Sequence, residues 1–320
     1  MRQSHRILRM IKNTIFLACV LLPASLPQAR PSFRSDVETV VVSCTVLDAT
    51  GVAVEGLTRD EFRVYDNGAR RLVQSFSFEE DLPLTFGVVI DASESQKEGI
   101  VEHTKTAGEL LHRILRPGDH AFVISVDEDV RLWIELADAS VDVRKYLAGS
   151  PGELFGDPCP KRAGSIPGLG PWSACGPSPI WNAIYDAARI KLQPIGGNKA
   201  LLVLTDGFDT GSTRTLNQTA DMVNKAGASF YAIQYQSGFG GRFAPELSKL
   251  VQDTGGIRFH PPGDDYRQIV SRIETDLRHR YVLGFRPDKL SGGGRHDVRI
   301  EVTRPDVTVR ARKTYFEDRQ

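Results

Sequence analysis

The feature that most constrains this chain is the stretch LTFGVVIDASES, residues 84–95. Its first part, residues 85–90, is almost wholly apolar, and a run this short fits a strand that is buried on both faces. The run is followed directly by Asp91, Ser93 and Ser95, which supply a carboxylate and two hydroxyls. Ligands of open α/β sheets bind in the crevice beyond the carboxyl ends of the strands. The stretch therefore predicts a core strand with a binding site at its end, although short Asp/Ser strings also cap helices.

Strand-like and helix-like segments alternate after this stretch. Apolar residues recur at helical spacing over residues 98–115, and the two strands 120–126 and 130–136 are joined so tightly that we expect them to pair antiparallel. Further helices are expected over residues 179–192, 215–225, 244–254 and 265–277, and further strands over 200–205, 229–234 and 256–260. This alternation predicts a mainly parallel, doubly wound α/β sheet. No glycine-rich phosphate loop follows a strand, which disfavours Rossmann and P-loop nucleotide sites.

Two later stretches add oxygen side chains that we expect at the same edge of the sheet. A strand ends in Asp206 within LLVLTDGFDTGS, and GPSPIWNAIY opens a helix with Ser178 in its first turn. Carboxylate and hydroxyl oxygens suit Mg²⁺ or Mn²⁺, and Mg²⁺ prefers an octahedron of such ligands. Two carboxylates and three hydroxyls leave one position open for water or for a partner's carboxylate. The predicted metal ligands are Asp91, Ser93, Ser95, Ser178 and Asp206; the alternative is that they are ordinary helix caps and turn hydroxyls.

This set of residues resembles the metal-ion-dependent adhesion site of von Willebrand factor A (vWA) domains. Asp91, Ser93 and Ser95 stand as in its first motif, and Ser178 takes the place of the threonine that is usual in the second. The flanking sequences GLTRDEFRVYDNGARRLVQSF and RHRYVLGFRPD…HDVRIEVTRPDVTVRARKTY resemble the VWFA-related family described from acidobacterial proteins. The resemblance covers nearly all of the mature chain. It implies a vWA fold and a metal site, and it says little about biological role.

Both ends of the chain are rich in strand patterns. Residues 36–83 contain β-branched runs and a DNG hairpin sequence, and residues 279–316 contain three more strand-like runs. Residues 71–78 and 307–315 are each expected to form one strand. Neither end is large enough to be stable alone. We therefore expect a small β-sandwich formed by both ends, with a vWA domain of residues 84–278 inserted in it; the alternative is two unrelated β appendages.

The first 30 residues are typical of a signal peptide. Basic residues precede the apolar run 15–22, and small residues and prolines follow it. An uncleaved membrane anchor is the alternative, although the run is short for a span. No later segment is apolar enough to cross a membrane. The sequence thus predicts an exported protein, periplasmic or secreted, with no transmembrane segment in its mature chain.

Export makes the cysteine positions informative, because disulfides form in oxidising compartments. Cys159 and Cys175 bracket a Gly/Pro-rich insertion, residues 152–178, and we expect them to pair. The alternative is a disordered loop with two reduced thiols. Cys44 lies in a strand-like run and is expected to be a buried free thiol. No Cys-x-x-Cys is present, which disfavours zinc and redox sites.

The charge balance and the sequence motifs disfavour several classes of function. Forty basic residues balance forty acidic ones, which disfavours nucleic-acid binding. No His-Glu-x-x-His or Gly-x-Ser-x-Gly motif is present, and we expect no enzymatic activity. We expect an exported binding module whose metal engages an acidic group on a protein partner, with Leu169 and Trp172 of the insertion as an apolar rim. The alternatives are a structural component of an envelope complex with a vestigial metal site, or a hydrolase on the same fold.

Overall fold

The chain divides into two units, Met1–Val37 and Glu38–Gln320, and all the residues described below belong to the second. The computed structural model describes residues 39–96, 99–127, 130–138, 178–236, 245–261, 265–287 and 294–316. The predicted signal peptide, residues 1–30, lies outside this set. Among the helices of the described part, none is both long enough and apolar enough to cross a membrane.

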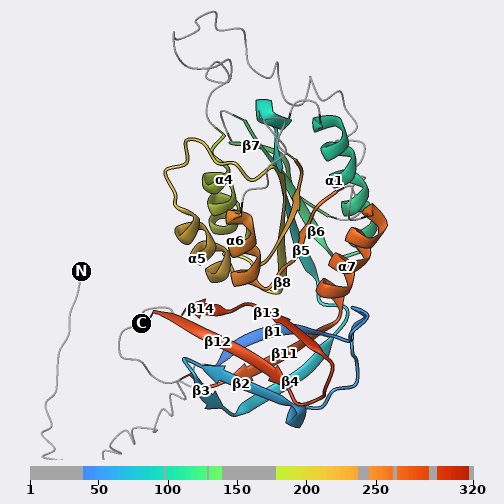
Figure 1. Ribbon diagram of the computed structural model, residues 1–320, viewed down its shortest axis with the longest axis vertical. Helices are drawn as coiled ribbons and strands as arrows, with labels where there is room; N and C mark the ends of the chain where they lie inside the picture. Colours follow the sequence, from blue (N-terminus) through green and yellow to red (C-terminus); the bar gives the residue numbers. More distant parts are fainter. Residues whose placement is uncertain are drawn as a thin grey trace, which may run out of the picture. The chain divides into compact units, whose positions relative to one another are not determined.

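A six-stranded sheet forms the centre of the α/β part (Figure 1). Its order is β10-β9-β8-β5-β6-β7, and all neighbours are parallel except the edge strand β7, which runs antiparallel to β6. The predicted doubly wound, mainly parallel sheet is therefore confirmed, including its antiparallel pair. The strands are β5 (Leu84–Asp91), β6 (His120–Val126), β7 (Val130–Asp138), β8 (Asn198–Thr205), β9 (Ser229–Gln234) and β10 (Arg258–Phe259).

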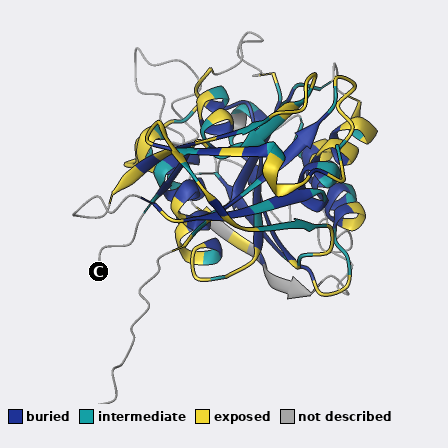
Figure 2. Ribbon diagram, turned by 90° about the horizontal axis from the view of Figure 1, so that it is seen from below, coloured by how far each residue is buried: buried dark blue, intermediate teal, exposed yellow. Residues whose placement is uncertain are grey.

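The strand β5 is buried along its whole length because helices cover both faces of the sheet. Phe86 and Val88 belong to the core on one face, and Val89 belongs to the core on the other. Gly87 shares the second face, where a Cβ atom would lie 2.3 Å from the ring of Phe122 on β6. Only glycine leaves room for that ring. Figure 2 shows the resulting buried strands in dark blue, with exposed residues on the surrounding helices and loops.

Helices α1 and α7 cover one face of the sheet, and α4, α5 and α6 cover the other (Figure 1). Each presents an apolar stripe at a spacing of three to four residues, as expected for a helix packed on a sheet. Their bounds are α1 (Ile100–Ile114), α4 (Ile180–Asp186), α5 (Leu216–Ala226), α6 (Glu246–Thr254) and α7 (Tyr266–Arg278). The helix predicted over residues 179–192 is α-helical only to Asp186, and its last part, Ala187–Leu192, is a π-helix.

Strands from both ends of the chain form two antiparallel sheets around one core. One sheet has the order β13-β1-β11-β4 and the other the order β14-β12-β2-β3. Each sheet combines strands from both ends, for example β1 with β11 and β2 with β12. The predicted β-sandwich is therefore observed. Its strands are β1 (Val40–Leu47), β2 (Phe62–Asp66), β3 (Ala69–Arg71), β4 (Val73–Glu79), β11 (Arg280–Phe285), β12 (Arg295–Val302), β13 (Thr308–Ala311) and β14 (Thr314–Phe316).

Two segments that were expected to be single strands are each divided between the sheets. In residues 71–78, β3 pairs with β2 whereas β4 pairs with β11, and Leu72 between them is 81% exposed. In residues 307–315, β13 pairs with β1 whereas β14 pairs with β12. Packed sheets lie about 10 Å apart, so one straight strand cannot pair in both. The prediction of one strand at each place was wrong.

The sandwich core is centred on Tyr281 of β11. Its ring contacts those of Phe62, Phe76 and Phe78, with centroids 5.0, 5.8 and 4.8 Å away. Its buried hydroxyl accepts a hydrogen bond from the backbone N–H of Leu57 at 3.1 Å. Aromatic rings from both ends of the chain therefore meet in one core.

Cys44 of β1 is a buried free thiol, as predicted. Burial raises the pKa of this thiol to about 12. Because the thiolate is the reactive form, Cys44 is expected to be inert in the folded protein.

Candidate metal centre

The candidate site lies where the strand order of the sheet reverses. From β5 the chain winds outward through β6 and β7; it then returns to β8, on the other side of β5, and winds outward through β9 and β10. The adjacent strands β5 and β8 run parallel, with Ile90 opposite Leu204. Their connections diverge at the carboxyl ends and leave a crevice there. Asp91 is the last residue of β5, and Asp206 follows the last residue of β8.

The carboxylate of Asp91 is the centre of a hydrogen-bonded cluster. Its Oδ1 accepts from the backbone N–H of Ser93 at 3.0 Å and from Ser178 Oγ at 3.4 Å. Its Oδ2 accepts from Thr205 Oγ1 at 2.5 Å. Ser93 Oγ lies 3.1 Å from Ser95 Oγ. The structure thus brings Ser178 to Asp91, Ser93 and Ser95, although Ser178 comes from a segment far along the sequence.

Asp206 adds a second buried carboxylate. Its Oδ1 accepts from the backbone N–H of Phe208 at 3.1 Å, and its Oδ2 is buried with no hydrogen-bond partner. Burial and the negative charge of Asp206 raise the pKa of Asp91 to about 6, against the hydrogen bonds from Ser93 and Thr205. In the described part of the chain, no lysine or arginine forms an ion pair with either carboxylate. Two buried like charges with one oxygen unpaired fit a divalent cation.

Ser178 is positioned by the loop that follows Asp206. Its backbone N–H donates to Thr210 Oγ1 at 2.8 Å, and the backbone N–H of Thr210 donates back to the Ser178 carbonyl at 3.0 Å. The carboxylate of Asp209 accepts from the backbone N–H of Trp181 at 3.1 Å. Asp209 therefore anchors the start of α4. The loop that carries Asp206 also fixes the position of Ser178.

Thr205 is a site residue that the sequence did not single out. Its side chain is fully buried; its hydroxyl donates to Asp91 and accepts from the backbone N–H of Gly207 at 2.9 Å. The available clue was a hydroxyl residue that closes an otherwise apolar strand. Of the other predicted residues, Cys159, Cys175, Leu169 and Trp172 lie outside the described residues.

A buried histidine packs near the start of α1. His103 is 2% exposed, and its ring stacks on that of Tyr235 with the centroids 3.7 Å apart. Its backbone N–H donates to the carbonyl of Gly99 at 2.9 Å. Burial lowers the pKa of His103 from 6.5 to about 4. The ring is therefore neutral in the folded protein at neutral pH.

Substituting His103 with phenylalanine is expected to flatten the dependence of stability on pH. The unfolded chain takes up a proton at His103 near pH 6.5, whereas the folded protein does so only near pH 4. Stability is therefore lost as the pH falls through this window, by up to about 3 kcal/mol. His103→Phe keeps the ring stack and cannot take up the proton. Urea unfolding of both proteins at several pH values between 7 and 4 tests this, and identical slopes would contradict it.

No protein-family model matches the chain, and no curated protein matches it. One similar solved structure is proximal thread matrix protein 1 from the mussel byssus, with 16% identity over 63% of this chain and 49% of that one and a TM-score of 0.44. A second is von Willebrand factor type A from Catenulispora acidiphila, with 14% identity over 88% of this chain and 75% of that one and a TM-score of 0.40. A third is the ArnB paralog VWA2 from Sulfolobus acidocaldarius, with 14% identity over 86% of this chain and 75% of that one and a TM-score of 0.42. The chain spans about half the length of the mussel protein, of which another structure has zinc at its metal-ion-dependent adhesion site. Two of the three bear the vWA name.

Proposed function

We propose that this chain is an exported vWA-type binding module that holds Mg²⁺ or Mn²⁺ at its switch-point crevice and engages an acidic group on a protein partner. The observation that carries this proposal is the meeting of two buried carboxylates at the ends of neighbouring strands, Asp91 and Asp206, with the hydroxyls of Ser93, Ser95 and Ser178. Two buried like charges are stable only with a proton or a cation between them. A donor set of oxygens alone favours a hard cation.

The residues of the site would offer such an ion two kinds of ligand atom. Asp91 and Asp206 would supply the negative charge, and Ser93, Ser95 and Ser178 would supply neutral oxygens. The hydrogen bond from the hydroxyl of Thr205, at the end of β8, holds the Asp91 carboxylate in its orientation. The bound ion would supply a positive charge with a coordination position left for a partner's carboxylate. With few negative ligands, the site keeps an attraction for that acidic group.

We extend this proposal to the surface around the ion. Phe208 is 44% exposed and lies two residues after the second carboxylate, so it offers an apolar contact beside the site. Leu169 and Trp172 would add to this rim if a Cys159–Cys175 disulfide closes the insertion. Apolar and aromatic anchors of this kind give interfaces much of their affinity.

The contacts of the serines favour binding over hydrolysis. The hydroxyl of Ser93 pairs with that of Ser95, and the hydrogen bonds of both within the described residues include no histidine. A serine nucleophile needs an adjacent base. The alternative of a vestigial metal site is disfavoured by the unpaired Oδ2 of Asp206, because a buried charge without a partner is costly.

Capture of envelope proteins on the immobilised mature protein tests this function. Retention is expected in Mg²⁺ buffer, and it should be lost in EDTA and lost again with Asp206→Asn in Mg²⁺ buffer. A retained protein should also lose binding when its exposed carboxyl groups are amidated. Equal retention in all these conditions would contradict the proposed function.

Substituting Ser178 with threonine is expected to preserve the affinity for Mg²⁺. Threonine keeps the hydroxyl that lies 3.4 Å from Asp91 Oδ1, and it is the residue that the family resemblance implies here. Ser178→Ala removes the oxygen and should weaken Mg²⁺ binding by roughly tenfold. Isothermal titration of both variants gives the comparison. If both variants bind equally well, the Ser178 hydroxyl is no ligand.

A further inference from the structure

A cavity of about 320 Å³ lies between the β-sandwich and the α/β part, far from the metal centre. It is formed by the start of β8, the segment before β9, the end of α7 and the sandwich strands β1, β11 and β13. These are the amino ends of the sheet strands, whereas the metal centre lies at their carboxyl ends. The volume is within the range of pockets that hold small molecules.

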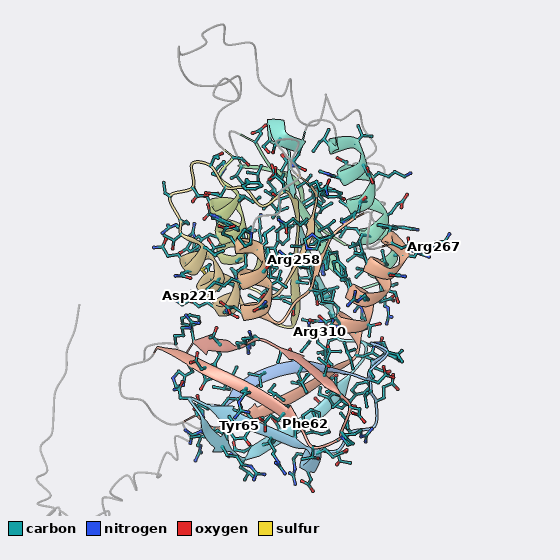
Figure 3. All side chains as sticks on the ribbon, viewed as in Figure 1. Phe62, Tyr65, Asp221, Arg258, Arg267 and Arg310 are labelled. Atoms are coloured by element: carbon teal, nitrogen blue, oxygen red, sulfur yellow. The ribbon has the colours of Figure 1, made fainter. Side chains whose placement is uncertain are left out.

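The cavity walls carry an excess of positive charge. Four basic side chains line the cavity, Lys199, Arg280, Arg310 and Arg312, and among the described lining residues the one carboxylate is Asp276. The formal charge of this lining is therefore four minus one, or +3. Figure 3 labels Arg310, which extends from β13 toward the end of α7.

The hydrogen bonds of Arg280 do not neutralise its charge. This residue is 8% exposed; its Nε donates to the carbonyl of Asp276 at 2.9 Å, and its two other nitrogens donate to the hydroxyls of Ser43 at 3.2 Å and Ser229 at 2.7 Å. All three acceptors are neutral. The carboxylate of Asp276 instead accepts from the hydroxyl of Tyr231 at 2.5 Å. A buried guanidinium is thus solvated by the protein without a hydrogen-bonded counter-ion.

Two other basic groups of the cavity also donate to neutral acceptors. Arg312 donates to the carbonyl of Val41, and Lys199 Nζ donates to the carbonyl of Ile195 at 2.7 Å. Arg310 forms an ion pair with the carboxylate of Asp276, with 3.7 Å between its Nη1 and Oδ1 of the carboxylate. Burial and the nearby Arg280 lower the pKa of Arg312 to about 10, and burial and Arg312 lower the pKa of Lys199. The cavity therefore gathers cations that repel one another, and the hydrogen bonds among the described residues occupy only part of their N–H donors.

We propose that this cavity binds a small molecule that carries a phosphate group. Guanidinium groups match the oxygens of phosphate with paired hydrogen bonds, and an ammonium group adds a point charge. A dianionic or trianionic ligand would balance the +3 lining. The volume leaves room for a substituent beyond the phosphate itself. The site is independent of the proposed metal centre, since it shares no residue with it.

Titration of the full chain with inorganic phosphate and with pyrophosphate, in EDTA and at constant ionic strength, tests this proposal. Binding should raise the melting temperature by about 2–5 °C at saturation, with pyrophosphate the tighter ligand. Arg312→Gln and Lys199→Gln should each weaken binding by at least about tenfold. Arg304→Gln is the matched control, because Arg304 is exposed, pairs with Glu61 and does not line the cavity.

Stability without anion separates a binding role from a structural one. Lys199→Gln removes one of several like charges, so its melting temperature in anion-free buffer should equal or exceed that of the unsubstituted protein. The proposal is overturned if neither probe binds at millimolar concentration, or if Arg304→Gln weakens binding as much as the cavity variants do. Citrate binding as tightly as pyrophosphate would also overturn it, because the cavity would then lack preference for phosphate.

Discussion

Substituting Asp206 with asparagine is expected to lower the affinity for Mg²⁺ by more than about a hundredfold, because loss of mere outer-shell partners already costs 10–100-fold. The variant keeps an oxygen that accepts from the backbone N–H of Phe208. It removes the negative charge of the Asp206 carboxylate, whose Oδ2 has no hydrogen-bond partner. It also removes the repulsion on Asp91. The metal-free protein should therefore melt at a higher temperature than the unsubstituted one. Isothermal titration and thermal unfolding in EDTA measure the two effects.

A matched control is available at the protein surface. Potential ligand atoms of Glu55, Glu80 and His279 lie within 4.8 Å of one another, so a divalent ion can associate there without involving the crevice. Glu80→Gln should leave the tight Mg²⁺ site intact. If Asp206→Asn retains the affinity and Glu80→Gln loses it, the metal site is at the surface and the proposed function fails.

The contacts of Asp91 change what its own substitution is expected to do. From sequence alone, alanine at this position should remove the metal and leave the fold intact. In the structure, the Asp91 carboxylate accepts from Ser93, Ser178 and Thr205, and alanine would leave buried donors without a partner. Unsatisfied buried donors cost about 1–3 kcal/mol each. Asp91→Ala should therefore lower stability as well as metal affinity, which makes Asp206→Asn the cleaner test.

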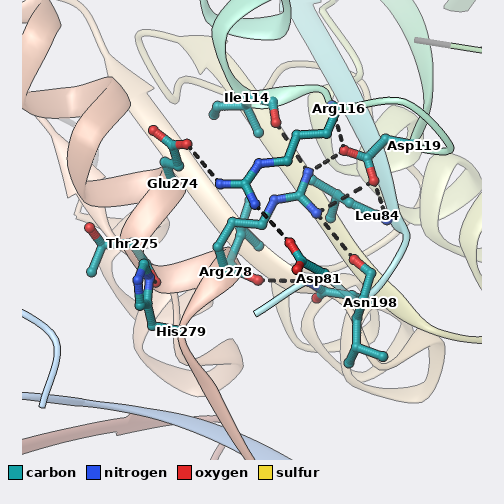
Figure 4. A network of polar contacts seen from close by, with 12 residues as sticks. Asp81, Leu84, Ile114, Arg116, Asp119, Asn198, Glu274, Thr275, Arg278 and His279 are labelled. Carbon is teal, nitrogen blue, oxygen red and sulfur yellow. Dashed lines mark hydrogen bonds and ion pairs between the residues drawn. The ribbon is translucent and has the colours of Figure 1, made fainter. Parts of the chain in front are cut away.

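Substituting Arg278 with methionine is expected to lower the free energy of unfolding by about 3–5 kcal/mol and the melting temperature by roughly 10 °C. Arg278, at the end of α7, forms a buried ion pair with Asp119, and the two side chains are 2% and 3% exposed. The guanidinium also donates to the carbonyls of Leu82 and Ile114, at 3.1 Å each. Figure 4 shows this network. Methionine would leave a buried carboxylate without its cation.

The Asp119 carboxylate explains why the effect should be large. Its oxygens accept from the backbone N–H groups of Leu84 and Arg116, at 2.8 Å each, so it fixes both the start of β5 and the turn after α1. Urea unfolding measures the loss, and Mg²⁺ affinity should be unchanged because the network lies at the opposite ends of the strands. Arg116→Met is the control: its side chain is 43% exposed and its ion pairs are solvated, so about 1 kcal/mol or less is expected.

A second substitution distinguishes loss of the charge pair from loss of packing. Adding Asp119→Asn to Arg278→Met removes the unpaired charge and keeps an oxygen for one of the two backbone donors, which bond to different oxygens of the carboxylate. The double variant should be more stable than Arg278→Met alone. If the double variant and Arg278→Met are equally stable, the packing of the arginine, and not its charge, stabilises the start of β5 and the turn after α1.

Much of the sheet and of the site could be predicted because the relevant information is local. A strand buried on both faces must be apolar at every position, so β5 and β8 are visible as continuous runs. Parallel strands end at one edge, so carboxylates directly after two such runs were expected to meet. The pairing of β1 with β11 was expected because the short strands of either end alone bury too little apolar surface for a stable core.

The remaining features depend on contacts between distant segments. Thr205 is one more strand residue in the sequence, and it becomes part of the site only because β8 lies beside β5. The break at Leu72 arises where the chain leaves one sheet for the other, which no local pattern marks. The cavity with excess positive charge brings together Lys199 of β8, Arg280 of β11 and Arg312 after β13. The net charge of the whole chain is zero. Composition and periodicity report what each segment buries, whereas the local charge of a cavity is decided by which segments the tertiary fold places around it.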